Sequence, residues 1–296
     1  MGVTLTIYFC EMGVDFMKNI DIEAVKNTRA GRVFLAYKEV MSLCNVKRSG
    51  FDFHGVNDPD EQHAKDEPFE PFFKNRPQSD AEHCFGIVVL IHFMSRFYPE
   101  VIGPSKFSDY IAVAILHEIG ENLIGDIPDD GTRNNAEKDA EELEYQKNFL
   151  MSTLGGCEVS SDYALFEQFI NKETLFGLTT YFLDKFDAII SNLIFEAWGR
   201  PGTLSYKKKR TGISSKDAES MAITGTDRTT DVWLCGLLLD IRKKYSTNRN
   251  EAEKDFINRT ACCFIEIVQA GAIIVRGEPM LWIDKKFPEY VGLYLH

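Results

Sequence analysis

The sequence predicts an all-α fold. Apolar residues recur with a period near 3.6 in most of the long segments, which is the spacing of one face of a helix. The central part of the chain has no run of alternating apolar and polar residues of the kind that indicates a β-strand. Apolar residues make up 44% of the 296 residues and charged residues 26%, so the chain has enough apolar side chains to form a buried core.

The N-terminal part predicts one helix followed by an irregular segment. Apolar positions from Asp21 to Val46 follow the helical period, with an interruption around Gly31. The segment from Gly50 to Ser79 is rich in Asp, Glu, Pro and Phe, which is typical of a long loop. We therefore expect residues 1–69 to form an N-terminal helical extension and loop.

Two helices with clear apolar stripes are expected next. The first runs from Ala81 to Phe97, and Pro99 closes it. Its stripe consists of Phe85, Val88, Val89, His92 and Phe93. The lone histidine His92 is interpreted as a packed core residue. The second helix runs from Ser108 to Gly125, and its stripe consists of Ile111, Ala114, Ile115 and Ile119.

The rest of the chain predicts further helices and one basic loop. The further helices are expected over Asn135–Leu154, Asp162–Ile170, Leu175–Trp198, Val232–Leu239 and Ala252–Val275. The first of these carries charge on most faces and is expected at the surface. Gly199 to Thr230 contains the basic run Lys207–Arg210 and is interpreted as a loop or linker. Residues 201–296 are thus expected to form a basic loop and a C-terminal helical segment.

Charge and cysteine content exclude several classes of protein. The net charge of -12 would repel the backbone of duplex nucleic acid, whereas a small phosphate ester held by a cation remains compatible with it. The seven cysteines are odd in number and contain no Cys-x-x-Cys pair, which indicates reduced thiols in the cytoplasm. No stretch approaches the roughly 20 apolar residues that span a bilayer, so no membrane partner is expected.

Histidines and carboxylates recur on three of the expected helices, and they predict a metal centre. Two imidazoles and two carboxylates form a ligand set that suits a divalent ion, such as Mn, Co, Fe, Mg or Zn. We predict that His83, His117, Glu118 and Asp184 bind this ion. Asp184 lies among apolar residues, where a buried carboxylate needs a cation or hydrogen-bond partners. An ion pair with Lys185 is the alternative for Asp184.

Glu121 is the candidate general base. It follows His117 by about one helical turn, so its carboxylate is expected on the same face, within reach of a metal-bound water. The pair His117-Glu118 also invites comparison with the His-Glu-x-x-His motif of zinc proteases. That motif requires a histidine at position 121, where this chain has Glu121, so a zinc protease is rejected.

Several segments resemble a known family. Ala114–Pro128 resembles the signature of HD-domain 5′-deoxyribonucleotidases, in which leucine-x-His-Asp precedes a glutamate and then Gly-Asp-Ile or Gly-Asp-Leu. Arg76–His83 resembles the segment with that family's first histidine. Glu137–Glu142 resembles its Lys/Glu-rich helix, and Phe182–Asp187 resembles the segment with its final metal aspartate. The resemblance implies an HD-domain helical bundle, a metal-dependent phosphohydrolase domain over residues 70–200, with N- and C-terminal helical extensions.

The same resemblance implies metal-dependent hydrolysis of phosphate esters, most closely of (deoxy)nucleoside 5′-monophosphates. In this reaction the metal polarises the phosphate and makes a water more acidic. Glu121 would orient or deprotonate that water, Asp126 would assist the leaving group, and Arg76 would contact the phosphate unless it forms a structural salt bridge. Hydrolysis of nucleoside triphosphates or phosphodiesters at this site, and a non-catalytic HD-fold binding module, are the alternatives. The family also implies a homodimer.

The chain departs from the family pattern in two places. Glu118 stands where the family has aspartate, and its side chain, one methylene longer, retains the charge but changes the ligand geometry. The metal preference is therefore expected to differ. The Arg-x-x-Trp-like element that such nucleotidases use around phosphate and sugar is absent upstream of Arg76. The reaction type is consequently predicted more firmly than the substrate.

Overall fold

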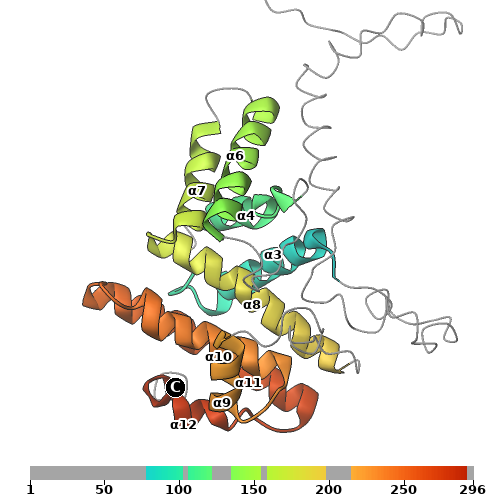
Figure 1. Ribbon diagram of the computed structural model, residues 1–296, viewed down its shortest axis with the longest axis vertical. Coiled ribbons are helices and arrows are strands. Elements are labelled where there is room, and N and C mark those ends of the chain that lie inside the picture. Colours follow the sequence, from blue (N-terminus) through green and yellow to red (C-terminus); the bar gives the residue numbers. More distant parts are fainter. Residues whose placement is uncertain (1–77, 103–105, 122–134, 155–158, 198–214, 292–296) are drawn as a thin grey trace, which may run out of the picture.

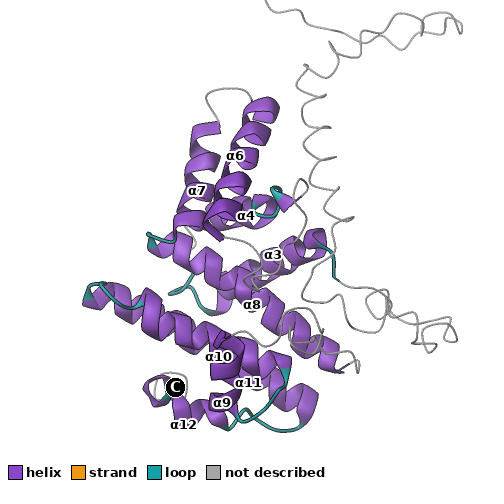
Figure 2. Cartoon of the chain, in the orientation of Figure 1, coloured by secondary structure: helices purple, strands orange, loops and turns teal. Residues whose placement is uncertain are grey.

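The structure is a computed structural model that describes residues 78–102, 106–121, 135–154, 159–197 and 215–291 (Figure 1). These residues form helices and contain no β-strand, which confirms the all-α prediction (Figure 2). The helices are α3 (Asp80–Phe97), α4 (Phe107–Leu116), α6 (Asn135–Leu154), α7 (Val159–Asn171), α8 (Leu175–Ala197), α9 (Ser215–Thr224), α10 (Thr229–Asp240), the π-helix η8 (Ile241–Tyr245), α11 (Glu251–Arg276), α12 (Trp282–Lys286) and α13 (Pro288–Val291).

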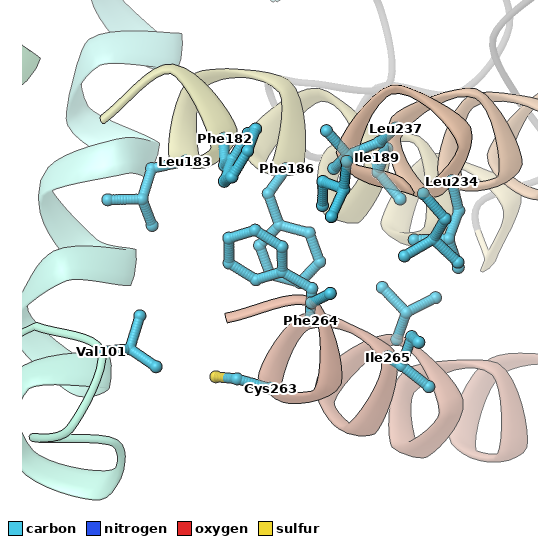
Figure 3. Packing of buried hydrophobic residues seen from close by; sticks show 14 of the residues in the cluster. Val101, Phe182, Leu183, Phe186, Ile189, Leu234, Leu237, Cys263, Phe264 and Ile265 are labelled. Atoms are coloured by element: carbon cyan, nitrogen blue, oxygen red, sulfur yellow. The ribbon is translucent and has the colours of Figure 1, made fainter. Parts of the chain in front are cut away.

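Helix α8 is the central element of the described fold. It crosses the middle of the molecule, with α3, α4, α6 and α7 on one side and α10 and α11 on the other (Figure 1). A continuous apolar cluster links these helices. Within it, the rings of Phe186 in α8 and Phe264 in α11 stack with their centroids 4.1 Å apart (Figure 3). Helix α8 thus holds its own side chains in fixed positions relative to α3, which carries His83.

The start of α3 is defined by a capping box. The backbone N–H of Glu82 donates to Ser79 Oγ over 3.3 Å, and the Ser79 N–H donates to Glu82 Oε2 over 2.8 Å. These two bonds satisfy backbone donors that have no partner within the helix. Glu82, the acidic neighbour of His83 in the sequence, therefore serves to cap α3 together with Ser79.

Helix α4 is shorter than predicted, because it ends at Leu116 and not at Gly125. A tight turn follows, in which the Ile119 N–H donates to the Leu116 carbonyl and the Glu121 N–H donates to the Glu118 carbonyl. Such bonds join residues three apart and tighten the chain after a helix. The interpretation of residues 117–120 as regular helix is therefore wrong, whereas Glu121 is helical, and residues 122–125 lie outside the described part.

The loop predicted over Gly199–Thr230 is wrong for its described half, since Ser215–Thr224 forms α9. This segment is polar, and its helix is stabilised by partners that lie far away in the sequence. Lys216 and Glu219 pair with Asp240 and Lys243, which lie at the end of α10 and in η8. The short helices α12 and α13 were not predicted either.

Most of the apolar stripe predicted for α3 faces away from the described core, although Val88 packs against it. Phe85 is 68% exposed, Phe93 is 53% exposed and His92 is also exposed, so the interpretation of His92 as a core residue is wrong. The buried face instead carries His83 and Cys84, together with Ile87, Ile91 and Met94. Helix α3 has apolar residues on two faces, so its periodicity alone did not indicate which face is buried.

The other predicted helices agree with the structure to within a few residues. Helices α3, α6, α7, α8, α10 and α11 all lie where the apolar period indicated them. The helix predicted over Asp21–Val46 lies outside the described residues. None of the described helices combines the length and the apolarity needed to cross a membrane.

Candidate metal centre

His83 lies at the contact between α3 and α8 and is completely buried. Its Nδ1 atom lies 2.6 Å from Asp187 Oδ2, and its Nε2 atom lies 3.0 Å from Asp184 Oδ1. Because an ionised carboxylate only accepts hydrogen bonds, the Nδ1–H of His83 donates to Asp187. The Nε2 atom is thereby presented to Asp184.

The turn after α4 brings the second histidine to the same place. His117 Nδ1 lies 3.0 Å from the Ala114 carbonyl oxygen, to which its N–H donates. His117 Nε2 lies 3.3 Å from His83 Nε2 and 3.3 Å from Glu118 Oε1. Glu118 Oε1 also lies 3.3 Å from His83 Nε2. Both histidines therefore direct the same nitrogen toward one point.

The four predicted ligands, His83, His117, Glu118 and Asp184, form one buried group. Each offers one donor atom, and these atoms all lie within 4.8 Å of one another. Neighbouring ligands of an ion bound at about 2.1 Å are separated by about 3.0 Å in octahedral and 3.4 Å in tetrahedral geometry. The shortest separations here, 3.0 and 3.3 Å, match these values. The convergence expected from the sequence is present, and the donor set fits a divalent cation.

The protonation of the group also favours a cation. Burial alone would lower the pKa of His117, but the adjacent Glu118 carboxylate and Cys84 outweigh it, so the pKa of His117 is raised well above its usual value. Burial would raise the pKa of Asp184, but Lys185 and His83 keep that pKa far below its usual value. The nitrogen and carboxylate oxygen atoms of the four residues thus face one another, and positive charge between them, from protons or from a metal ion, would offset their repulsion.

Asp184 lies within the candidate ligand group and also forms the ion pair that was the alternative interpretation. Its Oδ1 atom faces His83, and its Oδ2 atom lies 3.0 Å from Lys185 Nζ. The ion pair with Lys185 therefore coexists with a place in the ligand group. A carboxylate with one oxygen for a cation and the other for an ammonium group is held in a fixed orientation.

Glu121 lies close to the ligand group without belonging to it. Its side chain is buried, and Oε1 accepts from Lys138 Nζ over 3.4 Å. Lys138 Nζ also lies 3.3 Å from Glu142 Oε1. Burial and the nearby Glu118 raise the pKa of Glu142, while Lys138 lowers it. Glu121 is thus a buried carboxylate directly after the turn that carries His117 and Glu118, which we call the ligand turn. The other predicted functional residues, Arg76 and Asp126, lie outside the described residues.

Two glycines allow the helices around the group to approach closely. A Cβ atom on Gly86 would lie 2.2 Å from Asp187 Oδ1, and one on Gly120 would lie 2.9 Å from Glu142 Cγ. Neither distance is sterically possible for a side chain carbon. Gly86 therefore allows Asp187 to reach His83, and Gly120 allows the ligand turn to pack against α6.

Asp187, Lys138 and Glu142 had not been singled out as functional residues. Asp187 lies three residues after Asp184 in α8, and this spacing places both carboxylates on one face of the helix. That signal could have indicated a partner for the buried His83. Lys138 and Glu142 are four residues apart in α6, but only the fold shows that they face Glu121.

Comparisons with known proteins give one family and one distant fold neighbour. The family model described as HD domain matches residues 71–221, which is half of the chain. No curated protein matches the sequence. Among solved structures, a conserved hypothetical protein from Pyrococcus furiosus is 21% identical with a TM-score of 0.38, and the match covers 56% of this chain and 81% of that one.

Proposed function

Because the chain belongs to the HD domain family, we propose that it is a metal-dependent phosphohydrolase whose metal centre is formed by His83, His117, Glu118 and Asp184. The observation that carries this proposal is the buried group of four donor atoms within 4.8 Å of one another. A divalent cation held by these four residues would supply positive charge that stabilises a phosphoryl transition state and would make a nearby water more acidic.

The chain's own residues would orient the ligands and move the proton. Asp187 and the Ala114 carbonyl hold the Nδ1 side of the two histidines, so that both Nε2 atoms face the centre. Glu121 would accept the proton of the attacking water, and the ion pair with Lys138 would hold the Glu121 carboxylate in place. Asp126 would assist the leaving group, as in the family that the sequence resembles.

The substrate proposed is a phosphate ester, with (deoxy)nucleoside 5′-monophosphates as the first choice. This choice depends on the resemblance of Ala114–Pro128 to 5′-deoxyribonucleotidases. Arg76 would contact the phosphate, and the protein would act as a homodimer in the cytoplasm. The four described cysteines are free and buried, which is consistent with a reducing compartment.

The test is metal analysis followed by phosphate release from a panel of nucleoside mono-, di- and triphosphates. We expect bound divalent metal and turnover of at least one member of the panel. His83→Ala should remove both, whereas His92→Ala should retain both, because His92 lies on the same helix but is exposed and outside the ligand group. Metal-loaded protein that releases no phosphate from any member would contradict the hydrolase proposal.

A further inference from the structure

Lysine side chains gather beside Asp184, in a protein that is acidic as a whole. Lys185 Nζ lies 3.0 Å from Asp184 Oδ2, and its side chain is half-exposed. Lys172, between α7 and α8, is close enough to both Lys185 and Lys244 that their charges lower its pKa. With a net charge of -12, such a concentration of cations is unlike the average surface of this chain.

Lys172 and Lys185 share one aromatic ring. Lys172 Nζ lies 4.9 Å from the centroid of the Tyr181 ring, and Lys185 Nζ lies 5.5 Å from the same centroid. Tyr181 itself belongs to α8, three residues before Asp184. Both ammonium groups therefore lie around Tyr181, within one turn of Asp184 along α8.

Lys172 occupies its position at a cost. Its backbone has φ = 57°, in the left-handed region where glycine is favoured. Burial lowers the pKa of Lys172, and the charges of Lys185 and Lys244 lower this pKa further. The carboxylates of Asp139 and Asp184 act in the opposite direction and raise it. Its ammonium group donates to the Ile170 carbonyl over 2.8 Å. A strained, partly buried lysine next to two others is unfavourable for folding, and such positions cluster at functional sites.

We propose that Lys172 and Lys185 hold the phosphate oxygens of the substrate beside the metal centre. The inference rests on the proposed function and extends it, because it assigns the binding of phosphate to described residues of α8 and the segment before it. Lysine is a common phosphate ligand that acts as a point charge. Lys185 contacts Asp184, which is one of the four candidate ligands, and Lys172 contacts the Tyr181 ring.

The competing account is that the lysines only neutralise Asp184 and Asp139. Both carboxylates raise the pKa of Lys172, so they stabilise its charge. The two accounts differ in what happens to an added anion. Removing a lysine that only neutralises these carboxylates weakens phosphate binding through long-range charge, an effect that added salt screens. Removing a lysine that contacts the phosphate weakens binding at both salt concentrations.

The probe is orthophosphate, titrated by calorimetry into the manganese-loaded full chain at two salt concentrations. Lys172→Met should weaken phosphate binding by about tenfold, as for loss of one charge-assisted hydrogen bond, and Lys172→Arg should restore most of it. Lys185→Met should weaken it at least as much. The control is Lys147→Met. Lys147 Nζ lies 5.8 Å from the centroid of the Tyr163 ring, in a lysine–aromatic contact between α6 and α7 that contains none of the four candidate ligands.

Metal content is measured on every protein in the series. Lys172→Met should retain wild-type manganese, since Lys172 is not one of the four candidate ligands and its ammonium group donates to the Ile170 carbonyl. Wild-type phosphate affinity in manganese-loaded Lys172→Met and Lys185→Met would overturn the inference and leave the proposed function intact. Failure of the proposed function would instead be visible in the wild type, as absence of bound metal or of turnover.

Discussion

Replacing Gly86 by alanine tests the contact that orients His83. An alanine Cβ would lie 2.2 Å from Asp187 Oδ1, so the Asp187 carboxylate must shift by roughly 0.8 Å to reach a 3.0 Å contact, which disturbs its bond to His83. Alanine gains about 1 kcal/mol in helix propensity. Overpacking costs about 1 to 3 kcal/mol, and weakening the buried His83–Asp187 bond costs about 1.5 to 3 kcal/mol. The net destabilisation expected is about 1.5 to 5 kcal/mol.

The assay is urea unfolding of the metal-free protein, followed by circular dichroism. Gly236→Ala in α10 is the matched control, because the nearest atom to its Cβ would be Cε of Lys216 at 3.0 Å, near the end of a long side chain, and Ser220 Oγ would lie at an ordinary 3.6 Å. The control should be neutral or slightly more stable than the wild type. If Gly86→Ala were as stable as Gly236→Ala, the close approach of Asp187 to α3 would be wrong.

Three further predictions concern the ligand group and its neighbour. Glu118→Gln should weaken manganese binding by at least about tenfold in a chelator competition, because the loss of a residue that only hydrogen-bonds to a metal ligand already weakens binding by about that factor. Unchanged affinity would show that Glu118 is not a ligand. Glu121→Ala should retain the metal while turnover falls by about 10² to 10⁴, and loss of the metal would make Glu121 a ligand. The pKa of His117 is raised, so its proton must leave before a metal binds, and manganese affinity should increase as the pH rises above neutrality. An affinity that does not change with pH would contradict the raised pKa.

The helices were predictable where one apolar face packs on the core. Helix α6 begins and ends where the sequence indicated, at Asn135 and Leu154. The end of α4 was not predictable in this way, because its apolar period continues past the point where the chain turns. Only Gly120 marks the turn in the sequence, and its role depends on the approach of Glu142 from α6. The packing of α6 on this turn is a tertiary contact that no local pattern contains.

The four residues of the candidate ligand group were predictable as a set from the sequence, but the residues that position them were not. Buried histidines and carboxylates are costly in an apolar helix, so their presence indicates a shared cation. The bond between His83 and Asp187 depends on two helices that cross at Gly86. The buried face of α3 also depends on a contact between helices that the sequence pattern does not contain. Both faces of α3 are apolar, and the position of α8 determines that His83, and not His92, is buried.

Anomalous diffraction from crystals grown with manganese tests the central claim most directly. The account predicts a single strong peak at roughly 2.0 to 2.6 Å from Nε2 of His83, Nε2 of His117 and one carboxylate oxygen each of Glu118 and Asp184. Lys185 should still contact the other oxygen of Asp184. A manganese-loaded crystal with no peak among these four side chains would contradict the account.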